Sequence, residues 1–422
     1  MFKKTLIAVI TIAILAGITG CGKSTDSSEK VLKIWHYESE TGAMGKAWDA
    51  AIKKFQEKYP DVEVQFERKG FEQIRQTAQM VLNSDEAPDV MEFNKGNASS
   101  GMLSKQGLLA DLTEIAKKKG WDKLLSPSLQ TTCRYSADGI MGSGNWYGVT
   151  NYGEYVMVYY NKEMFAKYNL QIPKSIEEFE TVMAAFKKAG VTPMTLAGAE
   201  YPAQQVFYEL VLNKADRDFV NAYELYTKDI DFKNPAFIDG AEKMKNWIDK
   251  GYIDKNAVSL KAEDMGLAFS KGKSPIFVSG SWWYGRFVEE IGFDWGIFLF
   301  PGNKLHPGSG GNVWVVPEKA KNKKMAYEFI DITMSPEIQS ILGKEGGIPV
   351  NADLSMIEDA KLKELISNFD QIVKSDGLAF YPDWPAAGFY DTLVAGVQEL
   401  LSGSKTPEKF LESIGASYYE NK

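Results

Sequence analysis

The sequence has few of the residues from which covalent and metal-based sites are built. Its 422 residues include two cysteines and two histidines, so neither a disulfide framework nor a histidine-based metal site is expected. It also lacks the Gly-x-Ser-x-Gly and His-Glu-x-x-His motifs of many hydrolases. We therefore predict no bound metal and no cofactor.

Basic residues are in the minority. The chain carries 48 Lys and Arg residues against 56 Asp and Glu residues, which gives a formal net charge of −8. This acidic excess disfavours a nucleic-acid partner and offers no polybasic patch to a membrane surface. Carboxylates are plentiful, however, so a glycosidase that works with a pair of acids stays open at this point.

Long apolar runs are also scarce, and the clearest one lies at the N-terminus. Residues 5–20 carry no charge and follow two lysines. The run is short for a membrane-spanning helix, which needs roughly 20 apolar residues. A basic start, an apolar middle and small residues at the end predict a signal peptide over residues 1–20.

The end of this run points to a lipid anchor. Ile18-Thr19-Gly20-Cys21 resembles the bacterial lipobox, in which the cysteine is lipidated and becomes the new N-terminus. We expect lipidation at Cys21 and a flexible tether over residues 21–30. Cys133 would then have no disulfide partner and would pack as a small apolar residue. An ordinary signal peptide with an incidental cysteine is the alternative.

The rest of the chain alternates between strand and helix patterns. The runs PDVMEFN, YVMVYYN, PIFVSG, WGIFLF and VWVVP predict strands that are covered on both faces. Trp48, Phe55 and Tyr59 recur at helical spacing, and Ser175 begins a capping box. The alternation predicts an α/β fold with largely parallel sheets, and the length predicts more than one domain.

Aromatic residues gather beside small polar ones where the predicted strands end, in IWHYESE, SGSWWYG, GSGGNVW and YPDWPAAGFY. An indole can cover the weakly polar face of a sugar, and carboxylates and amides can bond its hydroxyls. Core packing is the alternative for most of these rings, and we expect it for Trp314. These stretches contain His36, Glu38, Glu40, Trp282, Asp383 and Trp384, and the pattern itself nominates Asn312 for ligand binding.

The adjacent pair Trp282-Trp283 allows a sharper prediction. In a strand or extended loop, neighbouring side chains point to opposite sides. One indole can therefore stack on a ligand while the other packs in the core. We assign the ligand role to Trp282.

Taken in order, these pieces resemble a known family. The chain contains KIWHYESETG, GLLADL, YYNKEMF, EKMKNWIDKGYID, GSWW and GNVWVVPEKAKNKKMAYEFIDITMSPEIQ. This order resembles the extracellular solute-binding proteins of ABC importers, in the oligosaccharide-binding branch that includes the maltodextrin-binding protein. The likeness covers nearly the whole chain after the lipobox.

The resemblance implies a two-lobed periplasmic-binding-protein fold of the type II kind. Each lobe would be a mostly parallel sheet flanked by helices, and a hinge of several segments would join the two. Lobe 1 would comprise residues 31–152 and 301–347, and lobe 2 residues 153–300 and 348–422. The chain would cross between them near Tyr152–Tyr155, Pro301 and Gly347–Val350.

Family positions also add ligand-binding candidates. The resemblance implies ligand-binding roles for His36, Glu38, Glu40, Trp282, Asp383 and Trp384. It also suggests Asn94 in the turn after PDVMEF and Glu154 at the first crossing. The acid that binds ligand in the maltodextrin-binding protein has no counterpart at Gly96, which weakens the case for maltodextrin itself.

We therefore expect a substrate-binding lipoprotein that captures an oligosaccharide and delivers it to the permease of an ABC sugar importer. It would be a monomer on the extracellular face of the bacterial cell membrane, held by its lipid, and not an enzyme. Two alternatives remain. One is an anchored glycoside hydrolase with the same acids, and the other is a binding protein for a polyamine or a peptide.

Overall fold

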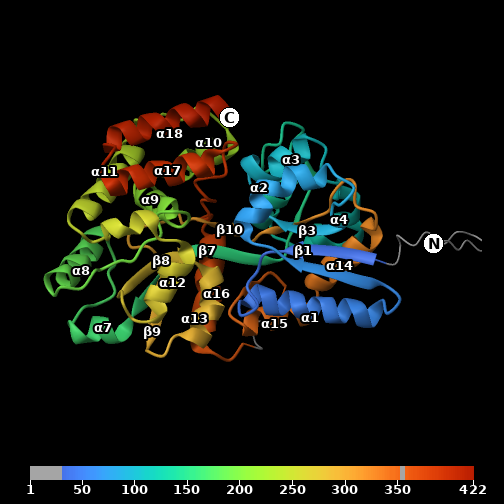
Figure 1. Cartoon of the computed structure of the whole chain (residues 1–422), viewed down its shortest axis with the longest axis horizontal. Helices are drawn as coiled ribbons and strands as arrows, with labels where there is room; N and C mark the ends of the chain where they lie inside the picture. Colours follow the sequence, from blue (N-terminus) through green and yellow to red (C-terminus); the bar gives the residue numbers. More distant parts are fainter. Residues whose placement is uncertain (1–30, 352–356) are drawn as a thin grey trace, which may run out of the picture.

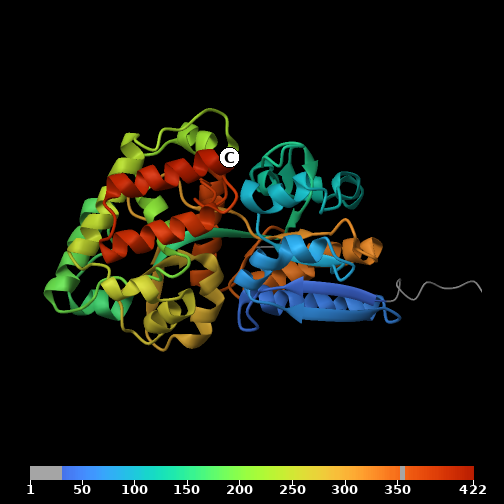
Figure 2. The same cartoon turned by 45° about the horizontal axis from the view of Figure 1, so that its top comes forward.

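The computed structural model describes residues 31–351 and 357–422. Cys21, the expected signal peptide and the expected tether lie outside these residues. The described chain forms two bodies, lobe 1 and lobe 2, that lie next to each other in both views (Figure 1 and Figure 2). Strand β7, Tyr152–Asn161, runs from one body into the other.

Lobe 1 is built on a five-stranded sheet with the order β2-β1-β3-β11-β6. Its strands are β1 (Val31–His36), β2 (Glu63–Arg68), β3 (Val90–Phe93), β6 (Val149–Thr150) and β11 (Val313–Val315). Strand β1 pairs in parallel with β2 and β3, whereas β11 is antiparallel to β3 and β6. Trp314 on β11 is fully buried, which confirms its expected place in the core.

Lobe 2 has β7 at the centre of its sheet. The first half of β7 pairs with β10 and β12, and the second half pairs with β8 and β9. These strands are β8 (Ile276–Gly280), β9 (Trp295–Phe298), β10 (Gly308–Gly310) and β12 (Ile348–Pro349). All ten residues of β7 are buried, which explains the unbroken apolar run in the sequence.

Each sheet contains one strand that runs against all the others. Strands β8, β9, β10 and β12 all oppose β7, and β11 opposes its neighbours in lobe 1. All strands of each sheet except one share a direction, as a mostly parallel sheet requires. The prediction is wrong for the hydrogen-bonded pairs that β7 and β11 form, because these pairs are antiparallel. The opposing strands β7 and β11 are each entered directly from a strand of the other lobe. No crossover helix precedes them within their own lobe, and such a helix is what returns the chain for a parallel strand.

Helices cover both sheets. Those of lobe 1 are α1 (Ala43–Lys58), α2 (Phe71–Leu82), α3 (Met102–Lys105), α4 (Thr113–Lys119), α5 (Trp121–Leu124), α6 (Pro127–Gln130), α14 (Lys323–Thr333) and α15 (Pro336–Lys344). A small ribbon, β4 (Arg134–Tyr135) with β5 (Asn145–Trp146), completes this lobe.

The helices of lobe 2 surround β7 and its partners. They are α7 (Lys162–Lys167), α8 (Ile176–Lys188), α9 (Ala203–Leu212), α10 (Arg217–Leu225), α11 (Pro235–Asp249), α12 (Ala262–Ser270), α13 (Tyr284–Glu290), α16 (Ala360–Lys374), α17 (Phe389–Ser402) and α18 (Pro407–Asn421). The hydroxyl of Ser175 accepts the N–H of Glu178 at 3.3 Å and caps α8, as its capping sequence predicts.

The chain passes between the sheets three times. The first passage joins β6 to β7, and the third is at β12. The second passage lies between β10 and β11, around Gly311, and not near Pro301. The preceding segment stays with lobe 2, because His306 bridges to Leu378 and β10 pairs with β7.

Cys133 is free and fully buried, and burial raises the pKa of its thiol to about 12. It is therefore an inert core residue, as predicted. Within residues 31–351 and 357–422, every helix is too short or too polar to cross a membrane.

Candidate functional site

A cavity of about 510 Å³ lies between the two lobes. One wall comes from the segments after β1 and β3 in lobe 1, and the other comes from α9, α12, the turn after β8 and the loop at 381–384 in lobe 2. Tyr152, Glu154 and Asn312 at the hinge form its floor. A volume in this range is typical of a pocket for a small organic ligand.

The structure brings most of the nominated residues to this cavity. Those that line it are Glu38, Asn94, Glu154, Trp282, Asn312, Asp383 and Trp384. They come from both lobes and from the hinge, so a bound molecule would contact all three parts. Trp384 lines the cavity even though only 2% of its surface is exposed.

His36 and Glu40 do not reach the cavity lining. His36 is fully buried, and its ring stacks on Phe66 with the centroids 4.6 Å apart. Burial and the nearby Arg68 lower the pKa of His36 to about 3, so it is a neutral core residue. His36 lies on the same face of β1 as Leu32 and Ile34, because alternate residues of a strand share a face, and that face is buried. Glu40 extends into solvent and pairs with Arg68 instead.

The two adjacent tryptophans both line the cavity but differ in burial, and the local backbone is not the expected extended segment. Residues Ser281–Trp283 form a tight helical turn, not an extended segment. The Trp282 ring folds back over Gly280, where an added Cβ would lie 1.9 Å from the ring. Trp282 is half-buried at the cavity. Trp283 reaches the cavity lining but is only 2% exposed, because most of its ring packs on Phe277 and Phe287.

Lys95 is the central cation of the cavity. Its ammonium donates to Glu154 Oε1 at 2.6 Å and to Asn312 Oδ1 at 3.0 Å. The same ammonium lies 5.2 Å from the ring centroid of Trp384 and 5.6 Å from that of Tyr381. A lysine of lobe 1 therefore contacts hinge residues and aromatic rings of lobe 2 at once, through an ion pair and cation–π contacts.

Hydrogen bonds continue from this lysine across the floor. Asn312 Nδ2 donates to the Tyr152 hydroxyl at 2.9 Å, and that hydroxyl donates to Glu38 Oε1 at 3.4 Å. The chain of contacts links the second strand passage to the end of β1. It fixes the side chains on the floor before any ligand arrives.

Two carboxyl groups at the cavity hold protons more tightly than usual. Burial raises the pKa of Glu38 from 4.5 to about 7, and repulsion from Glu154 adds to the effect. Burial likewise raises the pKa of Asp383 from 3.8 to about 6. Beneath Glu38, burial and the charge of Glu38 hold the pKa of Glu92 well above its ordinary range. These groups can donate as well as accept hydrogen bonds near neutral pH.

Several lining residues were missed from the sequence. Besides Lys95 they include Tyr201, Gln204 and Gln205. Both glutamines lie in α9, whose ten residues are all buried. Two adjacent amides in an otherwise apolar helix are a signal that sequence inspection could have used, because buried amides need polar partners.

Polar atoms of the lining remain without partners. Among the described residues, no hydrogen-bond partner is present for the hydroxyls of Tyr37 and Tyr381, for both amide atoms of Gln204 or for Gln205 Oε1. All of these residues line the cavity. Leaving a buried polar atom unpaired costs about 1–3 kcal/mol, so the cavity is suited to a ligand with many donors and acceptors.

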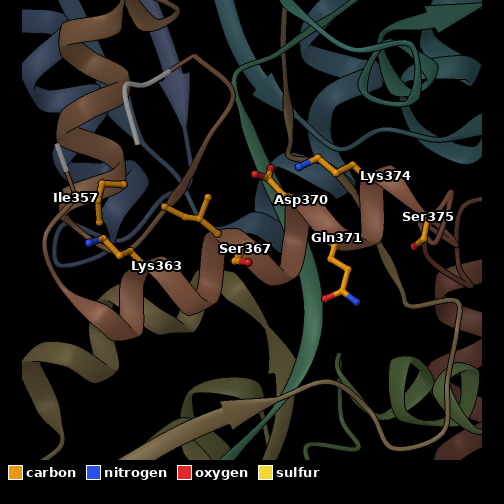
Figure 3. Close-up of a pocket in the computed structure, with 8 residues that line it drawn as sticks. Ile357, Lys363, Ser367, Asp370, Gln371, Lys374 and Ser375 are labelled. Carbon is orange, nitrogen blue, oxygen red and sulfur yellow. The ribbon is translucent and has the colours of Figure 1, made fainter. Parts of the chain in front are cut away.

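Elsewhere a larger hollow of about 610 Å³ runs along α16. The hollow is lined by residues of α16, by Ser375 directly after that helix, and by Ile357 (Figure 3). None of the described residues that line it is aromatic, and one helix supplies nearly all of them. The cavity between the lobes is the better candidate because it gathers rings, amides and acids from separate elements. Neither site offers metal ligands: the structured part of the chain has no group of three or more His, Cys, Asp or Glu placed to hold an ion.

The chain is similar to proteins from several bacteria. It is 26% identical over 270 residues to a probable sugar-binding periplasmic protein of Rhizobium meliloti, which covers 60% of each chain. It is 25% identical over 232 residues to a maltooligosaccharide ABC transporter solute-binding lipoprotein of Streptococcus pneumoniae, which covers 53% of each chain. The matched region thus spans about 60% of the length of the first of these relatives.

A solved structure confirms the fold. A chain from work on xylan utilization by the thermophilic bacterium Caldanaerobius polysaccharolyticus superposes with a TM-score of 0.80 at 20% identity, and the match covers 92% of this chain and 99% of the other. The α/β periplasmic-binding-protein fold, with two sheets flanked by helices, is therefore the fold of this protein.

The family follows from a match that is longer than half of the chain. The model of the bacterial extracellular solute-binding proteins matches residues 50–367, which include β3, β7, the hinge passages and most of the cavity lining. This protein belongs to the family of bacterial extracellular solute-binding proteins, which bind solutes and are not enzymes.

Proposed function

We propose that the protein is the substrate-binding component of an ABC sugar importer and that it holds an oligosaccharide in the cavity between its lobes. The observation that carries the proposal is the set of unpartnered polar atoms beside aromatic rings in that cavity. Sugar hydroxyls both donate and accept, so they can satisfy the amides of Gln204 and the hydroxyls of Tyr37 and Tyr381. The indole of Trp282 offers a flat face to a pyranose ring.

The two-sided lining supports capture by closure. A ligand shifts the balance between open and closed forms only if it makes better contacts in the closed form. Glu38 and Asn94 on one lobe and Trp282 and Asp383 on the other would supply that difference. The closed, loaded form would then dock on the membrane permease. The relatives named as sugar-binding and maltooligosaccharide-binding proteins favour this ligand class.

A cationic ligand such as a polyamine is the second candidate. The cavity lining contains more acids than bases, and Glu38 and Asp383 have no ion-pair partner among the described residues. Two observations weigh against it. Lys95 already occupies the position between Glu154 and the rings of Tyr381 and Trp384, and the raised pKa values of Glu38 and Asp383 reduce their negative charge.

A ligand screen tests the proposal directly. Unlipidated protein is heated with a panel of neutral oligosaccharides, with spermidine and with short peptides, and its unfolding midpoint is followed. We expect an oligosaccharide to raise the midpoint, since a ligand at a hundredfold excess over its Kd stabilises the folded state by about 2.7 kcal/mol. The recovered sugar should be intact. A response to spermidine alone, or cleavage of the sugar, would contradict the proposal.

The two tryptophans give a matched pair of variants. Trp282→Ala should weaken sugar binding by about 2 kcal/mol or more, roughly thirtyfold, because it removes the stacking face. Its unfolding free energy should change little. Trp283→Ala should instead lower the unfolding free energy by about 3–5 kcal/mol, because it empties a core position. Calorimetry and denaturant unfolding separate the two, and normal affinity in Trp282→Ala would assign that ring to packing.

The proton on Glu38 makes stability depend on pH. Its folded-state pKa of about 7 lies above the ordinary 4.5, so the folded protein binds this proton more tightly than the unfolded chain. Stability from this group is complete below about pH 4.5 and is lost as the pH rises to about 7, by at most about 1.4 kcal/mol per pH unit. Glu38→Gln should flatten the unfolding free energy over this window relative to wild type. Glu40→Gln is the control and should keep the wild-type slope.

We further propose that Cys21 carries the lipid that retains the protein at the extracellular face of the membrane, with residues 21–30 as the tether. The named lipoprotein among its relatives favours this. A diacylglyceryl group has two chains, and two chains anchor stably where one does not. Cys21→Ala should therefore lose the lipid adduct and membrane retention without a change in sugar affinity. Mass spectrometry of the detergent-solubilised wild-type protein checks this, and an unmodified Cys21 would refute it.

A further inference from the structure

A buried carboxyl group lies beneath Glu38 and is not part of the cavity lining. It belongs to Glu92 on β3, which runs parallel to β1 with Met91 opposite Trp35. The next step of this register places Glu92 beside His36, and paired residues of a sheet point to the same face. Glu92 is only 1% exposed. Its side chain therefore lies inside lobe 1, under the segment that carries Glu38 into the cavity.

Glu38 connects this buried position to the cavity. Its backbone N–H donates to His36 Nδ1 at 3.1 Å, and its Oε1 accepts the Tyr152 hydroxyl at 3.4 Å on the cavity floor. Glu38 is half-buried and lines the cavity, whereas Glu92 does not reach the lining. A ligand in the cavity can therefore contact Glu38 directly, but it can sense Glu92 only through Glu38.

The polar neighbour of the Glu92 carboxyl is the carboxyl of Glu38. The two groups lie within hydrogen-bonding range of each other, yet neither oxygen of Glu92 has a hydrogen-bond donor among the described residues. Ionised carboxyl groups only accept hydrogen bonds, so two of them cannot bond to each other. A proton between the two groups resolves this conflict, because a protonated carboxyl donates one hydrogen bond.

The charged groups around the two carboxyls do not replace that proton. Lys95, in the turn after β3, is the cation that faces Glu92, but its ammonium already donates to Glu154 Oε1 at 2.6 Å and to Asn312 Oδ1 at 3.0 Å. Glu154 on β7 repels a charge on Glu38. Two neighbouring carboxyls in a buried site cannot both ionise without a large cost in free energy, so the pair keeps a proton.

The proton stays on the deeper of the two groups. Burial and the charge of Glu38 hold the pKa of Glu92 well above its ordinary range, whereas burial raises the pKa of Glu38 only to about 7. The other ionisable groups that face the pair are the hydroxyls of Tyr37 and Tyr152, whose pKa values burial raises well above 10, so they stay neutral. Above about pH 7 the pair therefore consists of a neutral Glu92 and an ionised Glu38.

We propose that Glu92 is a positioning residue for ligand binding, which shares one proton with Glu38 and holds the Glu38 carboxylate in the cavity as a hydrogen-bond acceptor. Because the proton remains on Glu92, Glu38 keeps its charge and one fixed orientation. A ligand hydroxyl then donates to a charged acceptor, and such a hydrogen bond is roughly twice as strong as one between neutral groups. The inference rests on the proposed sugar-binding function, and it concerns a residue that the ligand does not touch.

Two substitutions of Glu92 separate its donor from its shape. Glu92→Gln is neutral and keeps a donor, because its amide can bond the Glu38 carboxylate, whereas Glu92→Leu fills a similar volume without a donor. Both are titrated by calorimetry at about pH 8 with the oligosaccharide that raises the unfolding midpoint most in the screen. Glu92→Gln should bind within about threefold of wild type, and Glu92→Leu should lose about tenfold or more. Wild-type affinity in Glu92→Leu would overturn the proposal, and so would equal losses in the two variants.

A double-mutant cycle shows whether Glu92 acts through Glu38. Glu38→Gln removes the charged acceptor and should itself weaken binding. Adding Glu92→Leu to this variant should change the affinity by no more than about threefold, because no carboxylate remains for Glu92 to position. If the two losses add in full, Glu92 affects the lobe without acting through Glu38, and the proposal is wrong.

Infrared spectra of the unliganded proteins at the same pH test the proton itself. The absorption of protonated carboxyl groups should be weaker in Glu92→Gln than in wild type, because the substitution removes the group that holds the proton. Glu38→Gln should shift this absorption by changing the partner of the proton, and the exposed control Glu40→Gln should leave it unchanged. Identical spectra of wild type and Glu92→Gln would overturn the shared proton.

The two kinds of measurement fail separately. If Glu92→Leu does not fold, the affinity and the spectrum of Glu92→Gln decide the proposal, since a loss of tenfold or an unchanged spectrum would each refute it. If no sugar binds wild type, the proposed function fails, and the spectra still decide whether Glu92 and Glu38 share a proton.

Discussion

The structure depends on one strand that belongs to both halves of the molecule. Each of the ten residues of β7 is buried, and its two halves serve different partners. Residues 152–155 pair with the hinge strands β10 and β12, and residues 156–161 pair with β8 and β9 in the core of lobe 2. Because hinge and core share one strand, a shift of the hinge segment of β7 along its partners would also shift the segment that the core of lobe 2 holds in register. Glu154 sits on this strand, so the floor of the cavity has the same fixed position.

The charge states of the acids around this floor depend on their burial, because burial removes the water that would stabilise a carboxylate. Glu154 is 4% exposed, yet it has a cation 2.6 Å away, so its desolvation is offset by the ion pair. Glu38 and Asp383 have no such partner in the structured residues, and burial raises their pKa values. The unliganded site therefore keeps polar groups in an unfavourable state. A ligand that supplies donors to them gains binding energy that a solvent-exposed site could not provide.

Local sequence patterns predict much of the fold and some of the residues that line the cavity. Buried strands show as unbroken apolar runs, and aromatic residues after β8 led to Trp282 at the cavity. His36 failed for a reason that the sequence also contains: it shares the face of β1 with Leu32 and Ile34, and that face is the core. The alternation of buried and half-buried residues along β1, and not the polar character of the imidazole, determines where His36 lies. Gln204 and Gln205 were missed because a buried helix hides which of its sides meets a cavity.

Lys95 and Gly96 show where sequence reasoning ends. A lysine in a polar turn normally reaches solvent, and only the approach of Glu154, Asn312 and the rings of lobe 2 converts it into a buried cation. Gly96 lacks the acid that the family resemblance suggested, and the structure supplies the reason: Trp384 occupies the space that a side chain would need. The partners of both residues are distant in sequence, so no local pattern can carry the signal. Contacts between separately folded lobes select these residues, and such contacts exist only once both sheets have formed.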